Sequence, residues 1–132
     1  MEVIAQTKYL RTSPRKLRLV ARALKGHPVG KALVLLSKIN KRAALPILKV
    51  LKSAAANAKN KGLSEANLKI KGVIVDGGPT YKRFQPISRG RAHPIAKRTS
   101  HIKVVLEEES GQAEGLGKIK GGVGGGEVPS KI

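Results

Sequence analysis

Cysteine, tryptophan and other aromatic residues are scarce in this sequence of 132 residues. There is no Cys and no Trp, and the aromatic residues are two Tyr and one Phe. The absence of cysteine excludes disulfides and Cys-bound zinc, and it fits a protein of the reducing cytosol. So few aromatic side chains cannot build the stacking platforms with which many proteins hold single-stranded nucleic acid.

Long apolar segments are also missing. No run approaches the roughly 20 apolar residues that a membrane-spanning helix requires. The N-terminal stretch MEVIAQTKYL lacks the basic region followed by an apolar core that marks a signal peptide. We therefore expect neither a membrane span nor a secretory leader.

Acidic side chains are few, and most of them lie near the C-terminus. The chain has 27 Lys and Arg against 8 Asp and Glu, a formal net charge of +19. Residues 1–106 hold 24 of the basic residues and only three of the acidic ones. A polyanion relieves such self-repulsion, so nucleic acid is the predicted partner and an anionic membrane surface is the alternative.

The sequence contains few side chains that could serve in catalysis or bind a metal. Between residues 3 and 106 the only carboxylates are Glu65 and Asp76, which cannot supply a two-metal nuclease site. Asp76 stands before a Gly-Gly-Pro sequence, and this context favours a turn or a bulge over acid–base work.

The three histidines, His27, His93 and His101, lie apart in the sequence with no ligand partners nearby. His27 precedes a proline and has the context of a loop residue. We interpret His93 and His101 as RNA contacts or solvated side chains rather than metal ligands. We therefore expect no catalytic residue, no metal and no cofactor.

The N-terminal half of the sequence predicts a strand over residues 3–10 followed by three helices. Ser13 and Pro14 suit the start of the first helix. Pro46 falls inside the third predicted helix, which indicates either a kink or a later start. The predicted helices cover about 13–26, 29–39 and 40–61.

Apolar residues recur at helical spacing in all three segments, which predicts a buried face on each helix. On the first helix, four basic residues share another face. The predicted core residues are Leu17, Val20, Ala21 and Leu24, then Ala32, Leu35, Leu36 and Ile39, then Ala44, Ile47, Leu48, Leu51, Ala54, Ala55 and Ala58. The basic residues are Arg15, Arg18, Arg22 and Lys25.

From Leu68 the pattern changes to the alternation of β-strands. Simple alternation places Ile74 on the same face as Leu68 and Ile70, and Val75 on the opposite face. A second alternating segment, RTSHIKVVLEE, begins at residue 98. We expect the two segments to pair as the arms of one long hairpin.

The predicted hairpin turns near Arg89-Gly90-Arg91, with Val75 opposite Val104 and Lys82 opposite Lys97. About a dozen residues per arm then extend beyond the apolar pairing, a projection of about 40 Å. An isolated two-stranded ribbon is marginally stable in water. We therefore expect this basic arm, over about 77–98, to be ordered by its partner.

Residues 110–132 contain eight of the fifteen glycines. Such a segment cannot recover its ordering entropy, so we expect a Gly-rich flexible tail after a domain that covers residues 1–109. The predicted fold class is α+β: a small globular domain of three helices packed on a short antiparallel sheet, with a long protruding β-hairpin.

Four motifs carry a resemblance to a known family: SPRKLRLVARALKG, KVLKSAAANAKN, VDGGPTYKRFQPISRGRA and KRTSHIKVVLEE. In this order and spacing, over about residues 4–106, the sequence resembles the L-twenty-two family of large-subunit ribosomal proteins, bacterial type. The resemblance implies a structural, non-enzymatic constituent of the large ribosomal subunit in the cytoplasm. It implies binding to large-subunit (23S-type) ribosomal RNA early in assembly, and neighbouring ribosomal proteins as partners. It implies no membrane and no homo-oligomer.

The resemblance also implies a surface position beside the polypeptide exit tunnel and a hairpin that lines the tunnel wall, with its tip near the nascent polypeptide. For the first helix, the family motif and the shared basic face together predict the rRNA-binding residues, which are Ser13, Arg15, Lys16, Arg18, Arg22 and Lys25. Those of the hairpin stem are Lys82, Arg83, Lys97, Arg98, Thr99, Ser100 and His101. The predicted tunnel-lining tip consists of Ser88, Arg89, Gly90, Arg91 and Ala92.

The alternative function is that of an architectural DNA-binding protein, which can also combine a small helical body with a basic β-arm that bears prolines. Such a protein prefers bent duplex DNA and usually acts as a dimer. This sequence shows one long arm and no obvious dimer seam. A basic nuclease that uses Asp76 is a more distant alternative.

Overall fold

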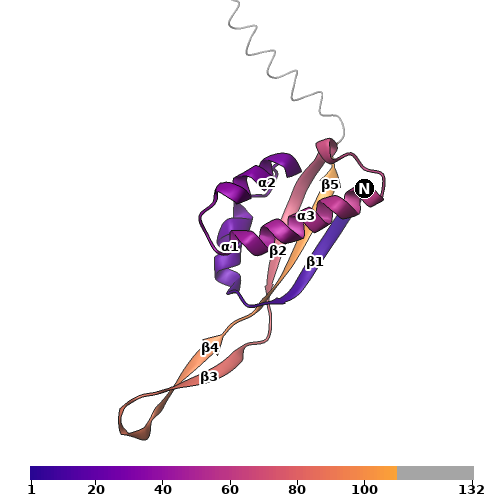
Figure 1. The fold of residues 1–132 in the computed structure, drawn as a ribbon. Coiled ribbons are helices and arrows are strands. Elements are labelled where there is room, and N and C mark those ends of the chain that lie inside the picture. Colours follow the sequence, from indigo (N-terminus) through magenta and orange to yellow (C-terminus); the bar gives the residue numbers. More distant parts are fainter. Residues whose placement is uncertain (110–132) are drawn as a thin grey trace, which may run out of the picture.

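Two helices pack against one face of a three-stranded antiparallel sheet, a third helix packs beside them, and a two-stranded arm extends from one end of the sheet (Figure 1). The computed structural model describes residues 1–109. The predicted tail, 110–132, lies outside the described residues. In chain order the helices and strands are β1 (Glu2–Leu10), α1 (Pro14–Arg22), α2 (Val29–Lys38), α3 (Ala44–Asn60), β2 (Leu68–Gly77), β3 (Tyr81–Pro86), β4 (Ala92–Lys97) and β5 (Ser100–Glu108). The predicted α+β arrangement is confirmed.

The first helix starts where its sequence predicts and ends earlier. Ser13 precedes it in an extended conformation, and Pro14 occupies the first turn. Beyond Arg22 the chain tightens into i to i+3 hydrogen bonds, and the Gly26 N–H then donates to the Ile70 carbonyl of β2 at 2.9 Å. Lys25 therefore lies in the turn after α1 and not on the helix.

The third helix begins at Ala44, four residues later than the predicted cap at residue 40. This is the later start that Pro46 indicated, since a proline in the first turn lacks only an N–H that has no helical acceptor. Small side chains follow on its buried face, and they let α3 lie close to β1 and β5. None of the helices within residues 1–109 is long and apolar enough to cross a membrane.

The core forms from the predicted faces. All four predicted core residues of the first helical segment are buried, and so are two of the four in the second and six of the seven in the third. Leu35, Ile39 and Leu48 are only half-buried. The central strand β5 contributes Ile102, Val104 and Leu106, which are fully buried against the helices.

The sheet has the order β1-β5-β2, and β2 contains a bulge. Ile70 pairs with Leu106, whereas Gly72 pairs with Val105, so Lys71 is an extra residue on β2. An extra residue reverses the alternation that follows it. Ile74 is consequently 46% exposed and Val75 is buried, the opposite of the predicted faces.

The predicted hairpin is present with a different register. Val75 pairs with Ile102, two residues from its predicted partner. Lys82 pairs with Ala96, one residue from its predicted partner. The turn centres on Arg89, which adopts a left-handed conformation with a φ of 62°, and the ladder is interrupted at the root of the arm, so the two halves of the hairpin carry different offsets.

Candidate nucleic-acid interface

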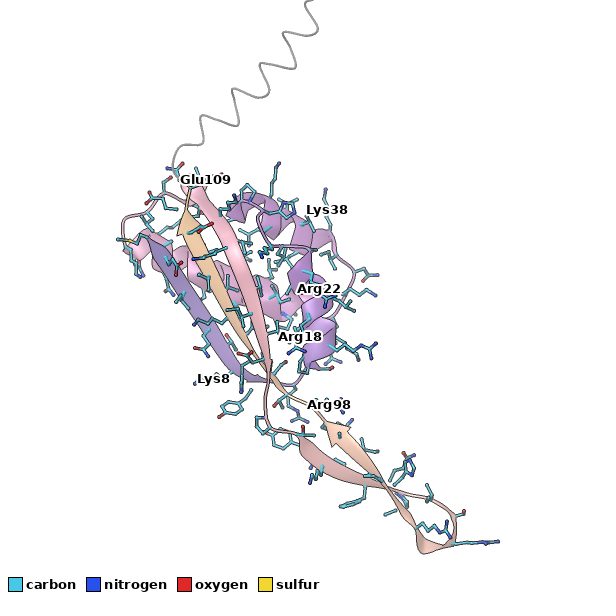
Figure 2. The ribbon with its side chains drawn as sticks, turned by 180° about the vertical axis from the view of Figure 1, so that it is seen from behind. Lys8, Arg18, Arg22, Lys38, Arg98 and Glu109 are labelled. Carbon is cyan, nitrogen blue, oxygen red and sulfur yellow. The ribbon has the colours of Figure 1, made fainter. Side chains whose placement is uncertain are left out.

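Cations without carboxylate partners cover much of the surface (Figure 2). Among residues 1–109 only three ion pairs form. They join Lys59 to Glu65, Lys69 to Glu109 and Lys71 to Glu2. The other basic side chains of the described chain have no carboxylate partner.

The N-terminal part of α1 presents its basic residues as predicted. Arg15, Lys16, Arg18 and Arg22 are all exposed. Arg18 also has an internal contact, because its Nε and Nη2 donate to the Val75 carbonyl at 3.2 and 3.0 Å. This contact fastens α1 to the edge of β2 and leaves other N–H groups of the guanidinium free to contact a phosphate.

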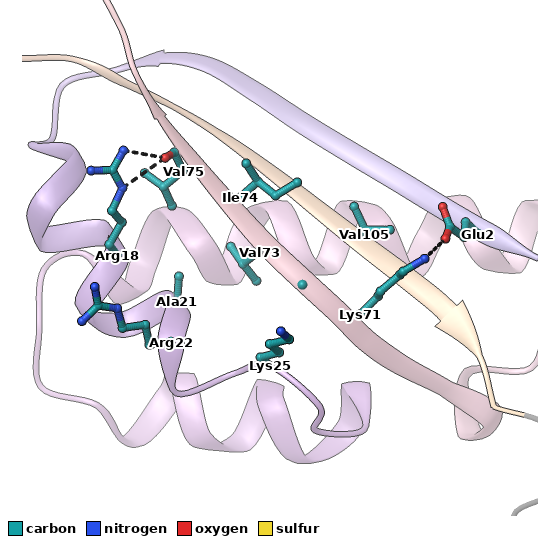
Figure 3. A pocket seen from close by; sticks show the side chains of 11 residues that line it. Glu2, Arg18, Ala21, Arg22, Lys25, Lys71, Val73, Ile74, Val75 and Val105 are labelled. Atoms are coloured by element: carbon teal, nitrogen blue, oxygen red, sulfur yellow. Dashed lines mark hydrogen bonds and ion pairs between the residues drawn. The ribbon is translucent and has the colours of Figure 1, made fainter.

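A hollow of about 650 Å³ lies between α1 and β2 (Figure 3). Arg18, Arg22 and Lys25 border it on the helix side, and apolar residues of β2 form its floor. Three of the predicted cations therefore converge on one surface, although Lys25 reaches it from the turn and not from the helix.

At the far side of this hollow, Lys71 reaches across β5 to Glu2 on β1 (Figure 3). The hydrogen bond from Lys71 lowers the pKa of the Glu2 carboxyl, and the same bond raises the pKa of the Lys71 amine. Both groups are therefore charged at neutral pH. The one carboxylate of the hollow is occupied by this pair, and nothing in the hollow resembles an acid–base site.

Thr99 and Ser100, predicted as RNA contacts, are buried at the root of the arm. The Thr99 hydroxyl donates to the Pro79 carbonyl at 2.6 Å, and the Ser100 hydroxyl donates to the Thr12 carbonyl at 2.6 Å. Both hydroxyls thus hold neighbouring loops together. Their place in the fold gives them a structural role in fixing the root, and a direct RNA contact would require the root to open.

His101 lies half-buried beside this root. Its Nδ1 accepts a hydrogen bond from the Tyr9 N–H at 3.0 Å, and the two rings meet edge to face with centroids 5.0 Å apart. Tyr9 adopts a left-handed conformation there, with a φ of 59°. Because Nδ1 is already an acceptor, Nε2 is the ring nitrogen that remains for a partner.

The arm itself has no core. Every residue of β3 is exposed, and so is nearly all of β4. The stem cations Lys82, Arg83, Lys97 and Arg98 surround the part nearest the body. At the tip, residues 88–92 are exposed, and the turn is closed by a hydrogen bond from the Ile87 N–H to the Arg91 carbonyl at 2.9 Å.

Sequence reasoning missed three cations that the fold brings to the same region. Arg11 precedes α1, while Lys41 and Arg42 lie in the connection between α2 and α3. Arg11 and Arg42 line one hollow together with the stem residues Lys97 and Arg98. The signal was the position of these cations immediately before two helices, but only the tertiary structure places the two loops side by side.

Within residues 1–109, no cluster of three His, Asp or Glu side chains is placed to hold a metal ion. A small α+β body with unpaired cations on one helix and an extended cationic arm has the features of a protein that binds structured nucleic acid through phosphate and shape.

Comparison with known proteins gives the family. The model of the family described as ribosomal protein L22p/L17e matches residues 5–107. The chain therefore belongs to this family, which confirms the family predicted from the four motifs. It also confirms the prediction of a structural, non-enzymatic protein and favours it over the DNA-binding alternative.

Three curated relatives align with this chain over nearly their whole lengths. A protein of Desulfatibacillum aliphaticivorans is 51% identical over 108 residues, which cover 82% of this chain and all of the relative. A protein of Mesoplasma florum is 46% identical over 110 residues, covering 83% of this chain and 98% of the relative. A protein of Mycoplasma capricolum is 47% identical over 110 residues, covering 83% and 99%. Each is named large ribosomal subunit protein uL22.

Proposed function

We propose that this chain is a structural constituent of the large subunit of the cytoplasmic ribosome and binds large-subunit ribosomal RNA through its body and arm. The family and the names of its relatives support the assembly. The observation that carries RNA binding is the arm, in which Phe84 is 72% exposed and no acidic residue offsets the basic ones. Such an arm is stabilised by phosphates and not by a core.

The arm divides into a stem that anchors and a tip that stays accessible. Lys82, Arg83, Lys97 and Arg98 lie near the rigid root, where a fixed orientation makes each phosphate contact less costly in entropy. Residues 88–92 lie farthest from the root and carry no apolar cluster. We assign the stem to ribosomal RNA and the tip to the wall of the exit tunnel, facing the nascent polypeptide.

The body is the part that enters assembly early and contacts neighbouring ribosomal proteins. It has its own core, so it folds before RNA is bound, and it offers Arg15, Lys16 and Arg22 without rearrangement. Pre-organised cations reduce the entropic cost of the first encounter. Phosphate contacts make that encounter fast and dependent on salt.

Sedimentation tests the assembly. The tagged full chain is expressed in bacterial cells, and lysates are separated on sucrose gradients at several salt concentrations. We expect it to sediment with large subunits and to remain there at moderate salt. Recovery of the folded chain only in the free soluble fraction would contradict the proposal.

Two arm variants test the division of labour. In the first, Lys82, Arg83, Lys97 and Arg98 are changed to Gln; in the second, residues 88–92 are deleted. The stem variant is expected to reduce incorporation into large subunits. The deletion is expected to preserve incorporation and to change the response to tunnel-binding antibiotics or to stalling peptides. Equal assembly defects in both variants would refute the division.

A further inference from the structure

A second groove, separate from the hollow in Figure 3, runs between α1 and the α2–α3 connection. It has a volume of about 540 Å³, and we call it the α1–α3 groove. Its floor is apolar and is formed by Leu19, Val20, Ala23 and Ile39. Leu19 is 64% exposed on α1, although a large apolar side chain in that position contributes nothing to the core.

All the charged residues at the rim of the α1–α3 groove are basic. Arg11 and Lys16 border one side, and Lys41 and Arg42 border the other. All four side chains are exposed, and none belongs to an ion pair formed within residues 1–109. No carboxylate lines the groove, so an anionic ligand meets no repulsion there.

The rim continues onto the arm. Arg11, Ser13 and Arg42 also line the hollow at the arm root, together with Ala96, Lys97 and Arg98. The Arg11 guanidinium carbon lies 5.3 Å from the centroid of the Tyr81 ring at the start of β3. Six cations from four segments thus form one continuous path: Arg11, Lys16, Lys41, Arg42, Lys97 and Arg98.

We propose that the α1–α3 groove holds one unstacked nucleotide of a single-stranded RNA segment, whose following phosphates run along the cationic path to the arm stem. This deepens the proposed function and rests on it. The base lies on the apolar floor beside Leu19. Arg11 and Arg42 bind its flanking phosphates or cover its face with a guanidinium plane.

The shape of the path favours RNA over an acidic peptide. A polynucleotide carries one charge at every residue, so it matches cations that extend beyond the groove onto the arm stem. An amphipathic acidic peptide would match the groove alone and would gain little from Lys97 and Arg98.

A photo-crosslinking experiment identifies the occupant. Leu19 is replaced by a photoreactive amino acid in the full chain, the variant is incorporated into large subunits, and crosslinks are mapped after irradiation. We expect crosslinks to ribosomal RNA that concentrate on one nucleotide position. A matched control places the same amino acid at Leu45, which is exposed on α3 and lies outside the groove. Crosslinks from residue 19 to a protein, or spread equally over the two positions, would overturn the proposal.

Binding measurements test the rim. The change of Arg11, Lys41 and Arg42 to Gln is compared with the change of Lys31, Lys49 and Lys52 to Gln, which removes equal charge elsewhere on the exposed surface. With full-length large-subunit RNA as the probe, the rim variant is expected to lower the log–log salt slope by about 2 to 3 and to bind at least about tenfold more weakly. Equal losses in the two variants would overturn the groove assignment.

The outcomes separate this inference from the proposed function. If the unmodified chain fails to bind the RNA and to enter subunits, the proposed function fails. If it binds and enters while the rim variant matches its control, only the groove assignment fails. Circular dichroism of each variant checks that the body remains folded.

Discussion

The body and the arm of this protein follow opposite rules, although β2 and β5 of the body run directly into the arm. In the body, side chains such as Leu17 and Ile47 are completely buried, and helices cover one face of the sheet. In the arm, two strands pair only with each other, and Phe84 lies in solvent. Apolar packing maintains the first region, whereas the second has a ladder of backbone hydrogen bonds and no buried side chain.

This contrast shows where a partner is needed. The body gains from burial, since each buried aliphatic side chain contributes about 1.5–3 kcal/mol. The arm gains nothing comparable and carries repelling charges, so its order depends on the fixed root and on an external polyanion. The packed body and the exposed arm meet at the root, which contains the buried hydroxyls of Thr99 and Ser100.

The largest expected effect comes from the body. Leu17→Ala removes a fully buried side chain of α1, and we expect it to lower the free energy of unfolding by about 2–5 kcal/mol. Phe84→Ala removes a larger side chain from the arm and is expected to change that free energy by less than about 0.5 kcal/mol. Urea denaturation of both variants measures the difference. Similar losses would mean that the free arm possesses a core of its own.

The root gives the next effect. A Cβ at Gly78 would lie 2.5 Å from the Thr99 Oγ1 and 3.1 Å from the His101 Cε1. Gly78→Ala is therefore expected to cost about 1–3 kcal/mol by overpacking and to increase protease cleavage in the arm. Gly77→Ala is the matched control, because its nearest neighbour is the Pro14 Cγ at 3.9 Å. Equal behaviour of the two variants would show that the root is not tightly packed.

A smaller loss is expected from Thr99→Val, which keeps the shape of the side chain and removes its hydrogen bond to the Pro79 carbonyl. Loss of one buried hydrogen bond costs about 1–2 kcal/mol. Thr80→Val, at an exposed position one residue beyond Pro79, serves as the control and should be nearly neutral. Denaturation of the two variants in parallel gives the comparison. An unchanged stability of Thr99→Val would show that the hydroxyl does not stabilise the root.

The smallest effect is expected at the ion pair between Glu2 and Lys71. Because the pair lowers the pKa of Glu2, its contribution to stability is present above the ordinary pKa of a glutamate and is lost as pH falls through the lowered value. The pKa of Lys71 is raised, so the contribution of its charge to stability is lost only as the pH rises through that raised pKa, at alkaline pH. Both groups are exposed, so Glu2→Gln should change stability least among these variants. NMR titration of the Glu2 carboxyl in the wild type and in Lys71→Gln measures the shift, and an unchanged pKa would contradict the pair.

Much of the body could be predicted because the apolar residues that recur at helical spacing are the ones that the fold buries. The bulge could not, since one extra residue at Lys71 leaves the composition of β2 unchanged and still exchanges the faces of Ile74 and Val75. The sequence also does not show that the loop before α1 lies beside the α2–α3 connection. Nothing in the sequence brings Arg11 beside Arg42, because their distance is fixed by how α1 and α3 pack.

The positions of Thr99 and Ser100 at the root were hidden for a related reason. The two residues follow two basic residues in a motif that resembles an RNA-binding stem, so the sequence predicts them as RNA contacts. In the structure their hydroxyls donate to the carbonyls of Pro79 and Thr12, and neither contact is local in sequence. Side chains of this size fit either a phosphate or a backbone carbonyl, and only the fold decides between them.

The central position of β5 has a mechanical consequence. This strand continues into the arm while it is hydrogen-bonded to β1 on one side and to β2 on the other. Antiparallel hydrogen bonds lie perpendicular to the strands, so tension along the arm loads the β1–β5 ladder in shear, with all of its bonds sharing the force at once. A pull on the tip is therefore resisted by the whole β1–β5 ladder at once and not by one hydrogen bond after another.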